Sequence, residues 1–430
     1  MGVRKLHMRQ AYRIIPIYTA DVSGVCSALY ELGGMTVMHD PSGCNSTYNT
    51  HDEIRWYDQD SLIFISGLSE IDAIMGNDDK FVHDTAKAAH ELKPRFIALA
   101  SSPIPFLNGT DFPALAEILE DETGIPAFAV LTNGMHDYVY GAGMALAAIA
   151  ERFTDPAANS GAGGSGGTEG PDGPGSCGST AGSCGNPRSV NILGVTPLDF
   201  GPLSHGETMK KSLETMGWYV ISTWAMGDGL ETISRAGEAA VNLVVSSVGL
   251  RAAKVLREKF GTPYVVGAPV GEFTEKLSMT MERAVESREC EVAYLTAHTS
   301  VSGSGGEGTG TWISASSSME EPDVADITLI GEPVTMGSLA AAIENQYGRS
   351  VRVLCPLEEW EGLLSPEDEA VSGEEEMEEK LKNAKIIVAD PLYKPICPKD
   401  SRFYELPHIA FSGRIFLKKI KKMPGFAELL

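Results

Sequence analysis

The chain contains 430 residues, of which 43% are apolar and 21% charged, which is ordinary for a globular protein. One hydrophobic core rarely grows beyond about 250 residues, so we expect two or three domains. The formal net charge of −24 argues against a nucleic-acid or anionic-membrane surface, because such surfaces need clustered Lys and Arg.

The seven cysteines are too widely spaced for a dense disulfide framework and include no Cys-x-x-Cys pair, which favours a reducing compartment. No long apolar core follows the basic first residues, and no stretch approaches the roughly 20 apolar residues that cross a bilayer. We therefore expect a cytoplasmic protein without a secretory signal.

The first predicted domain, residues 1–155, alternates short apolar runs with segments whose apolar residues recur every 3.6 residues. The runs predict buried strands and the periodic segments predict covering helices, an order that implies a parallel sheet. The expected strands are Met35–Met38, Leu62–Ile65, Phe96–Ala100 and Phe128–Leu131, with helices over 78–91 and 114–120.

Residues 156–188 consist almost entirely of Gly, Ser, Ala, Pro and Asn. Such a composition cannot bury enough apolar surface to offset its ordering entropy, so we predict a flexible insertion. Cys177 and Cys184 lie in it in matching Gly-Ser-Cys-Gly settings, but two thiols without His or acidic neighbours do not establish a metal clip.

Two further α/β domains are predicted at 189–290 and 291–430, the last with a Gly/Ser loop at 300–318. Helices over 207–216 and 250–260 end at Gly217 and Gly261. No Gly-x-x-x-x-Gly-Lys-Ser/Thr sequence occurs, so the chain itself is not expected to hydrolyse ATP. The strands expected in these two domains are Val190–Val195, Tyr219–Ser222, Leu243–Ser246 and Tyr264–Val266, then Val292–Thr296, Ile327–Ile330, Val351–Leu354, Ile386–Ala389 and Ile409–Phe411.

Cys44 is the best-placed reactive side chain, because it follows a strand in the turn Asp-Pro-Ser-Gly-Cys at 40–44. In an open α/β sheet, ligands bind at the loops that follow the strands. Pro41 fixes its backbone angle, and Gly43 lets the main chain approach a bulky object such as a metal cluster. A free buried thiol in an ordinary turn is the alternative.

The turn at 40–44 resembles the Gly-Pro-x-Gly-Cys turn of nitrogenase component 1 subunits. That family also holds the dark-operative protochlorophyllide reductase subunits, a cofactor-assembly scaffold pair and the nickel-tetrapyrrole reductive cyclase. Residues 66–76 resemble its Ser/Thr-x-x-x-Glu-x-Asp-x-Val-x-Gly-Gly segment, with Asn77 for the second glycine and Lys80 retained. Residues 191–194, 239–244, 260–264 and 330–333 look like its later landmarks, so the likeness spans nearly the whole chain outside the two Gly/Ser stretches.

The resemblance implies three Rossmann-like domains with parallel sheets and an iron–sulfur cluster, [4Fe–4S] in type, held near Gly43 and Cys44 at a subunit interface. It also implies electrons from a separate ATP-dependent iron protein. Two cysteines of the family are missing, because their positions fall near Thr19 and near Pro103. A [4Fe–4S] cluster needs four ligands, usually thiolates.

The remaining cluster ligands would come from Cys26, from Asp40 or His39, or from a partner subunit. A homodimer would pair two copies of Cys44, and a heteromer would add a second component-1-like subunit. Cys26 opens a predicted helix, where the dipole favours a thiolate, and its alternative role is that of a small buried residue. The candidates for ligation or proton relay beside the same loop are His39 and His51, with structural roles as the alternative, whereas Cys355 and Cys397 are expected to be structural.

The large nitrogenase cofactor needs a cysteine after the Asn-Leu-Val strand, but residues 244–249 contain no thiol. An iron–molybdenum-type cofactor and dinitrogen reduction are therefore not expected. Asp199, His205 and Trp224 follow strands of the second domain, where a ligand could lie.

Three functions remain open. The first is a nitrogenase-like oxidoreductase subunit that takes part in electron transfer through the interface cluster. The second is a scaffold subunit that holds a metal cofactor for delivery. The third is a cluster-free small-molecule binding protein on the same fold.

Overall fold

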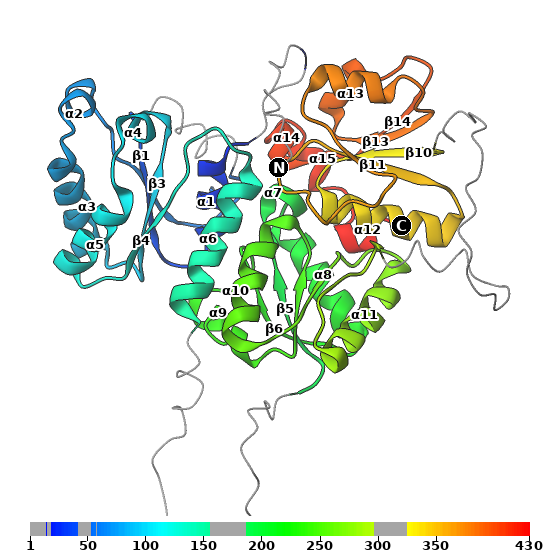
Figure 1. Ribbon diagram of the computed structural model, residues 1–430, viewed down its shortest axis with the longest axis horizontal. Coiled ribbons are helices and arrows are strands. Elements are labelled where there is room, and N and C mark those ends of the chain that lie inside the picture. The colour runs from blue at the N-terminus through cyan, green and yellow to red at the C-terminus, as the bar shows by residue number, and fades with distance from the viewer. Residues whose placement is uncertain (1–13, 15–18, 42–52, 57, 155–185, 296–324) are drawn as a thin grey trace, which may run out of the picture.

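The computed structural model describes residues 14, 19–41, 53–56, 58–154, 186–295 and 325–430. The described chain forms three α/β units, each built on an all-parallel sheet (Figure 1). The predicted fold class is therefore confirmed. The boundaries of the predicted domains remain predictions, and most of the insertion at 156–188 and all of the loop at 300–318 lie outside the described residues.

The first sheet has the strand order β2-β1-β3-β4. Met35 and Val37 of β1 face a core shared with α3 and α5, whereas Met38 belongs to the core that α1 and α6 cover. Successive side chains of β1 therefore point to opposite faces of the sheet and pack against helices on both faces. The elements are α1 (Asp21–Leu29), β1 (Met35–His39), β2 (Leu62–Ile65), α2 (Glu70–Met75), α3 (Asp78–Leu92), β3 (Ile97–Ser101), α4 (Pro103–Asn108), α5 (Phe112–Thr123), β4 (Ala127–Val130) and α6 (Tyr138–Phe153).

The second sheet has the order β6-β5-β7-β8-β9. The sequence places the strand expected at Val292–Thr296 in the third unit, but Val292 of β9 pairs with Val266 of β8, so that assignment is wrong. Gly217 and Gly261 adopt the positive φ values of 85° and 68° expected after a helix. The elements are β5 (Ser189–Leu193), α7 (Pro197–Phe200), α8 (Leu203–Thr215), β6 (Tyr219–Thr223), α9 (Leu230–Ile233), η3 (Ala236–Glu238), β7 (Val241–Val244), η4 (Ser247–Gly249), α10 (Leu250–Phe260), β8 (Tyr264–Val266), α11 (Phe273–Ser287) and β9 (Glu291–Val292).

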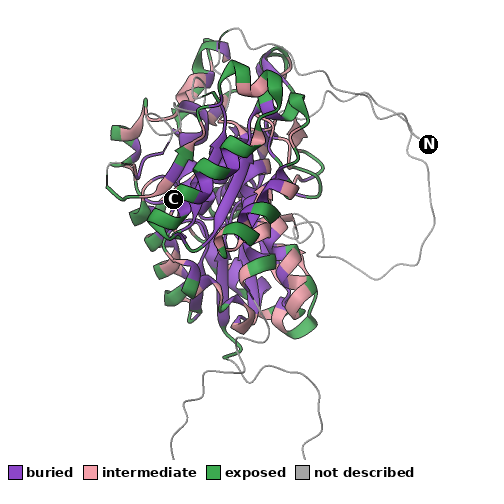
Figure 2. Cartoon of the chain, turned by 90° about the vertical axis from the view of Figure 1, so that its left-hand side faces the viewer, coloured by how far each residue is buried: buried purple, intermediate pink, exposed green. Residues whose placement is uncertain are grey.

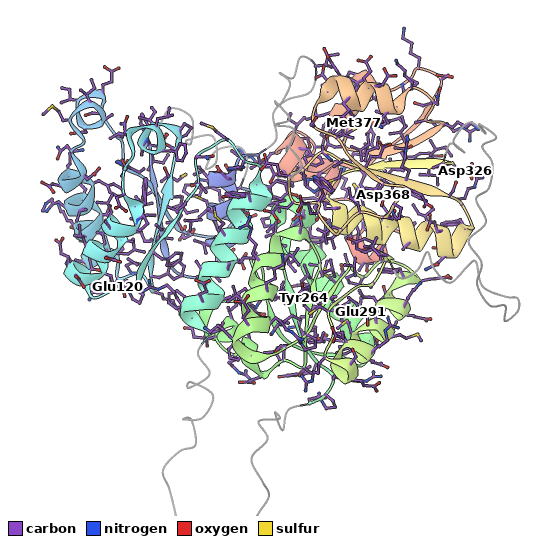
Figure 3. The ribbon with its side chains drawn as sticks, viewed as in Figure 1. Glu120, Tyr264, Glu291, Asp326, Asp368 and Met377 are labelled. Carbon is purple, nitrogen blue, oxygen red and sulfur yellow. The ribbon has the colours of Figure 1, made fainter. Side chains whose placement is uncertain are left out.

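The third sheet has the order β12-β11-β10-β13-β14. Residues Ile409–Phe411, expected to form a strand, instead lie in a short helix, because Gly413 N and Ser412 N bond back to the carbonyls of Ile409 and His408. Asp368 lies in the third unit (Figure 3), and its carboxylate accepts a hydrogen bond from Val353 N of β11. The elements are β10 (Ile327–Ile330), α12 (Pro333–Tyr347), β11 (Val351–Cys355), β12 (Glu369–Ala370), α13 (Glu374–Leu381), β13 (Ile386–Ala389), η6 (Pro391–Ile396), β14 (Arg402–Glu405), α14 (Ile409–Ser412), α15 (Leu417–Ile420) and η7 (Phe426–Glu428).

Helices α1 and α6 cross with their backbones almost touching. A Cβ atom on Gly24 would lie 2.1 Å from the Tyr138 carbonyl oxygen, and one on Gly141 would lie 2.0 Å from the Asp21 carbonyl oxygen. Helix α6 also packs against α10, so it joins the first unit to the second. Figure 2 shows the buried strands inside and the exposed faces of the helices outside. In the described part of the chain, no helix combines the length and apolarity that a membrane span requires.

Candidate functional site

The carboxyl edge of the first sheet gathers the loops that follow four parallel strands. Strand β1 ends at His39 and leads to Asp40, while Ser66 follows β2 and Ser102 follows β3. Cys44, Gly43 and His51 lie outside the described residues, so their roles stay predictions. The described side chains nevertheless define the surroundings from which the Cys44 loop departs.

His39 is buried at this edge, with 4% of its surface exposed. Its Nδ1 lies 2.8 Å from the Ser66 hydroxyl oxygen, and its ring centre lies 4.2 Å from that of Phe81. Burial lowers the pKa of His39 to about 4, so the imidazole is neutral near pH 7. A neutral imidazole is the form that binds metals or passes protons.

Asp21 ties the start of α1 to the loop that follows β4. Its carboxylate accepts hydrogen bonds from Asn133 N at 3.0 Å and Gly134 N at 2.9 Å. Burial raises the pKa of Asp21 despite these bonds. Gly134 in turn packs on Pro103, since a Cβ there would lie 2.8 Å from the Pro103 Cγ. The two positions at which the resemblance leads one to expect cysteines are thus both near Asp21, because Thr19 lies two residues before it and Pro103 packs on Gly134, which donates to it.

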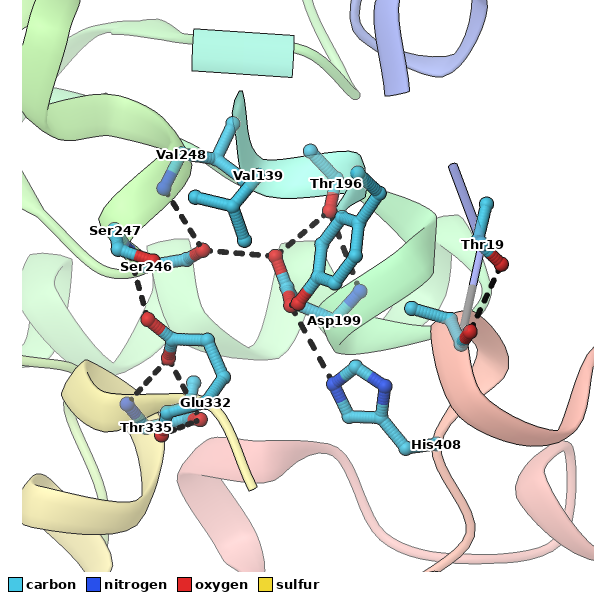
Figure 4. Close-up of polar contacts among 12 residues, drawn as sticks. Thr19, Val139, Thr196, Asp199, Ser246, Ser247, Val248, Glu332, Thr335 and His408 are labelled. Carbon is cyan, nitrogen blue, oxygen red and sulfur yellow. Dashed lines mark hydrogen bonds and ion pairs between the residues drawn. The ribbon is translucent and has the colours of Figure 1, made fainter. Parts of the chain in front are cut away.

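The polar side chains at these two positions differ in their hydrogen-bond partners. Thr19 donates from both its N–H and its hydroxyl to the Ala410 carbonyl oxygen, at 3.0 and 2.8 Å (Figure 4). Ser102, directly before Pro103, is fully buried, and its hydroxyl has no hydrogen-bond partner among the described residues. A buried hydroxyl without a partner is costly, which marks Ser102 as a polar group that a ligand at this edge would satisfy.

Cys26 lies inside α1 and is completely buried. Burial, followed by the charge of Glu53, raises the pKa of Cys26, which favours the neutral thiol over a thiolate ligand. It lies five positions after Asp21 in the helix, or roughly 7.5 Å along the axis, away from the carboxyl edge. The structure therefore does not bring Cys26 to the described part of this edge.

The described residues alone do not fit a complete cluster shell. They supply imidazole, carboxylate and hydroxyl groups at the edge but no thiol, and among them no three His, Cys, Asp or Glu side chains form a metal-binding group. Four ligands, usually thiolates, are needed for a [4Fe–4S] cluster. Such a shell would need Cys44 together with thiolates from another subunit.

A second polar region lies where the three units meet, around Asp199 of α7. Its carboxylate accepts hydrogen bonds from the Tyr138 hydroxyl, from Thr196 Oγ1 at 2.9 Å and from Ser246 Oγ at 2.8 Å (Figure 4). The Nε2 atom of His408 lies 3.4 Å from the same carboxylate. The side chain of Asp199 is completely buried, so these groups stabilise a charge that water cannot reach.

Glu332, at the end of β10, connects this region to the third unit. Its carboxylate accepts hydrogen bonds from Ser247 N at 2.8 Å and from the N–H and hydroxyl of Thr335 at 2.7 and 2.8 Å. Burial and the nearby Asp199 charge raise the pKa of Glu332. We call the set Tyr138, Thr196, Asp199, Ser246, Glu332 and His408 the junction network.

Ser246 lies in the segment where a large nitrogenase cofactor would need its cysteine. Here the hydroxyl is bonded to Asp199, and the junction network offers carboxylate, hydroxyl and imidazole groups without a thiolate. These residues do not fit the thiolate anchor of an iron–molybdenum-type cofactor. The sequence had singled out Asp199, but not Tyr138, Glu332 or His408.

The other residues considered from the sequence have internal partners. His205 Nδ1 lies 2.9 Å from the Phe200 carbonyl oxygen, and Trp224 Nε1 donates to Ser222 Oγ at 2.9 Å. Burial raises the pKa of Cys355 and raises that of Cys397 to about 12. Both cysteines therefore carry protonated thiols near neutral pH.

Comparisons with known proteins agree with this fold. The chain matches one of the subunits of light-independent protochlorophyllide reductase from Prosthecochloris aestuarii (strain DSM 271 / SK 413) at 39% identity over 84 residues, 19% of this chain and 16% of that relative. The corresponding protein from Nostoc punctiforme (strain ATCC 29133 / PCC 73102) is 30% identical over 108 residues, 25% of this chain and 21% of that relative. The chain thus aligns with only about a fifth or less of the length of these curated relatives.

A solved structure described as "Nitrogenase Cp1 at pH 6.5" superposes with a TM-score of 0.61 at 15% identity, covering 94% of this chain and 88% of that one. At this identity the likeness concerns the fold alone. The profile of the nitrogenase component 1 type oxidoreductase family matches residues 24–299, which is more than half of the sequence. The chain therefore belongs to the nitrogenase component 1 type oxidoreductase family.

Proposed function

We propose that this chain is a subunit of a nitrogenase-like oxidoreductase complex and takes part in electron transfer through an iron–sulfur cluster at a subunit interface. Cys44 is the ligand that this chain supplies, and Gly43 lets the backbone pass close to the cluster. The observation that carries the proposal is that β1 ends at His39, five residues before Cys44 in the sequence, at the carboxyl edge of a parallel sheet in a chain of this family. When bound, the cluster supplies one-electron transfer.

The chain's own residues would shape the surroundings of this loop. His39 offers a neutral imidazole held by Ser66, and Ser102 offers a buried hydroxyl without a described partner. Thr19 is already bonded to the third unit, so it is not a replacement ligand. The missing ligands would come from thiolates of a second component-1-like subunit, or from Cys44 of a second copy. We favour the heteromer, because two Cys44 thiolates supply only half of a four-ligand shell.

We further propose that the ATP-dependent iron protein docks on the exposed apolar side chains of α2 and α4. Asn108 donates to the Ala73 carbonyl oxygen at 3.0 Å and so holds the two helices together. This apolar surface lies at the carboxyl edge of the first sheet, the edge at which β1 ends before the Cys44 segment, and exposed apolar patches of this kind mark sites of protein–protein contact. Its exposed side chains are Ile71 at 73%, Ile74 at 82%, Met75 at 74%, Phe106 at 50% and Leu107 at 73%.

A substitution on this surface tests the docking. Leu107→Asp places a charge in the apolar surface and should slow oxidation of the reduced iron protein by at least tenfold. The matched control is Ile118→Asp on α5, which changes an apolar side chain of 49% exposure away from this edge. Equal rates for the two variants would place the donor elsewhere.

Anaerobic reconstitution distinguishes the enzyme from its alternatives. The chain is purified under strict anoxia with a second component-1-like subunit, and oxidation of the reduced iron protein is followed with and without ATP. ATP-dependent oxidation supports the oxidoreductase. An iron-containing complex that accepts no electrons would indicate the scaffold subunit, and a colourless, iron-free complex would indicate the small-molecule binding protein. The cytoplasmic location remains a prediction from the sequence.

A further inference from the structure

A cavity lies between the edge strand β2 and helix α3. Its walls are the apolar side chains of Met35 and Val37 on β1, Phe64 on β2, and Phe81 and Ala88 on α3. Its volume is about 160 Å³. An engineered apolar cavity of about 150 Å³ is large enough to bind benzene. The space therefore fits a single aromatic ring.

The topology explains why this space is left open. Strand β2 is the end of the sheet, and α3 packs mainly on β1 and α5 rather than over β2. Phe64 pairs in register with Val37, so both side chains point to the face that α3 covers. Phe64 nevertheless keeps 38% of its surface exposed. The edge strand thus contributes an apolar wall that the described residues leave partly uncovered.

His39 supplies a polar group to this cavity. It is 4% exposed, and its Nδ1 is bonded to Ser66. The other ring nitrogen, Nε2, has no hydrogen-bond partner among the described residues, although His39 lines the cavity. This nitrogen is therefore available to pair with the hydroxyl group of a ligand in the cavity.

The charges at the rim disfavour an anionic ligand. Lys80 Nζ lies 3.9 Å from the Asp72 carboxylate and 3.8 Å from the Asp84 carboxylate, and all three residues line the cavity. Two carboxylates against one ammonium leave a net negative rim. A carboxylate ligand would be repelled there, whereas a neutral hydroxyl group would not.

We propose that this cavity binds a small uncharged aromatic molecule with one hydroxyl group, of which phenol is the simplest. The ring packs among Met35, Phe64 and Phe81. The hydroxyl pairs with Nε2 of His39, and because a phenol both donates and accepts, it suits either tautomer of the imidazole. The site shares His39 with the surroundings of the Cys44 segment, but its apolar walls and the binding of phenol need neither the cluster nor a partner subunit.

Phenol titration of the full chain tests the proposal. Methionine methyl groups are labelled with ¹³C, and the Met35 signal is assigned with Met35→Leu. Phenol should shift the Met35 signal saturably, with a dissociation constant on the order of 1 mM for so small a ligand. Benzene should bind several-fold more weakly, and benzoate at least tenfold more weakly.

Two pairs of variants locate the binding. Ala88→Phe fills the cavity and should weaken phenol binding at least tenfold, whereas Ala114→Phe, on α5 outside the cavity, should not. His39→Phe should reduce phenol to the affinity of benzene, whereas His83→Phe, an exposed histidine on α3, should leave it unchanged. If Ala88→Phe does not fold, Thr85→Leu replaces it, because Thr85 also lines the cavity. The absence of a saturable Met35 shift, an unchanged affinity in the filled cavity, or benzoate binding as tightly as phenol would overturn the proposal.

Discussion

The hydroxyl of Tyr138 donates a hydrogen bond to the carboxylate of Asp199 and thereby joins the first α/β unit to the second. Both side chains are completely buried. Burial and the charge of Asp199 raise the pKa of Tyr138, so the phenol keeps the proton that it donates. Since Asp199 also contacts Ser246 and His408, one buried charge connects all three units.

Removing this hydroxyl should weaken the whole molecule. Tyr138→Phe deletes one of the donors to a buried carboxylate, and such bonds contribute about 1.5 to 3 kcal/mol. We expect the free energy of unfolding in urea to fall by that amount. The control is Tyr140→Phe, because the half-buried Tyr140 stacks on His136 and its hydroxyl bonds to no described residue, so its change should stay within about 0.5 kcal/mol. Equal losses of unfolding free energy in the two variants would show that the hydrogen bond to Asp199 contributes no extra stability.

Arg55 should be far more important for stability than a surface arginine. Its guanidinium lies 2.7 Å from Glu53 and 2.8 Å from Glu31, is 6% exposed, and also donates to the Ala225 carbonyl oxygen of the second unit. Arg55→Met leaves two nearly buried carboxylates without this cation, which should cost about 3 to 5 kcal/mol in urea unfolding.

The control for Arg55 is Arg95→Met. Arg95 pairs with Glu231, and the two side chains are 46% and 71% exposed. Exposed pairs contribute about 0 to 1 kcal/mol. If both substitutions cost the same, burial of the Arg55 pair would not determine its contribution.

Stability should depend on pH through His39. Its pKa is lowered from 6.5 to about 4 in the folded protein, chiefly by burial, so between these values the unfolded chain binds more protons. The stabilising contribution is therefore complete above pH 6.5 and is lost as the pH falls toward 4, by at most about 3 kcal/mol. We expect His39→Phe to flatten the pH dependence of unfolding between pH 6.5 and 4. The control is His83→Phe. If His39→Phe leaves the slope of unfolding free energy against pH unchanged, the lowered pKa of His39 is contradicted.

The buried strands could be predicted from the sequence because their apolar runs are long enough to leave one interpretation. Ile327–Ile330 and Ile386–Ala389 form strands with the predicted bounds. The edge strand β14, Arg402–Glu405, was missed because its exposed, polar sequence carries no apolar run. Ile409–Phe411 was apolar but too short to tell a strand from a buried helical turn, and its local hydrogen bonds made it a turn of helix.

The candidate sites differ in the same way, because one is contiguous in the sequence and the other is assembled by packing. The Cys44 loop could be proposed because a strand, a turn and a thiol follow one another directly in the chain. The junction network could not, because Tyr138 and Asp199 lie 61 residues apart and Ser247 and Glu332 lie 85 apart. Only the packing of α6, α7 and β10 brings those side chains together. For Cys26, the sequence indicated a helix start that favours a thiolate, but it could not show that the side chain is fully buried in the packed structure.

The most direct test of the proposed function is the iron and acid-labile sulfide content of the anaerobically purified complex after Cys44→Ala. We predict that this variant loses most of its iron and the visible absorption of the cluster. The matched variant Cys290→Ala, which removes a half-buried thiol of the second unit near Tyr264 N, should keep both. A Cys44→Ala complex with the full iron and sulfide content of the unaltered protein would contradict the role of Cys44 as a cluster ligand.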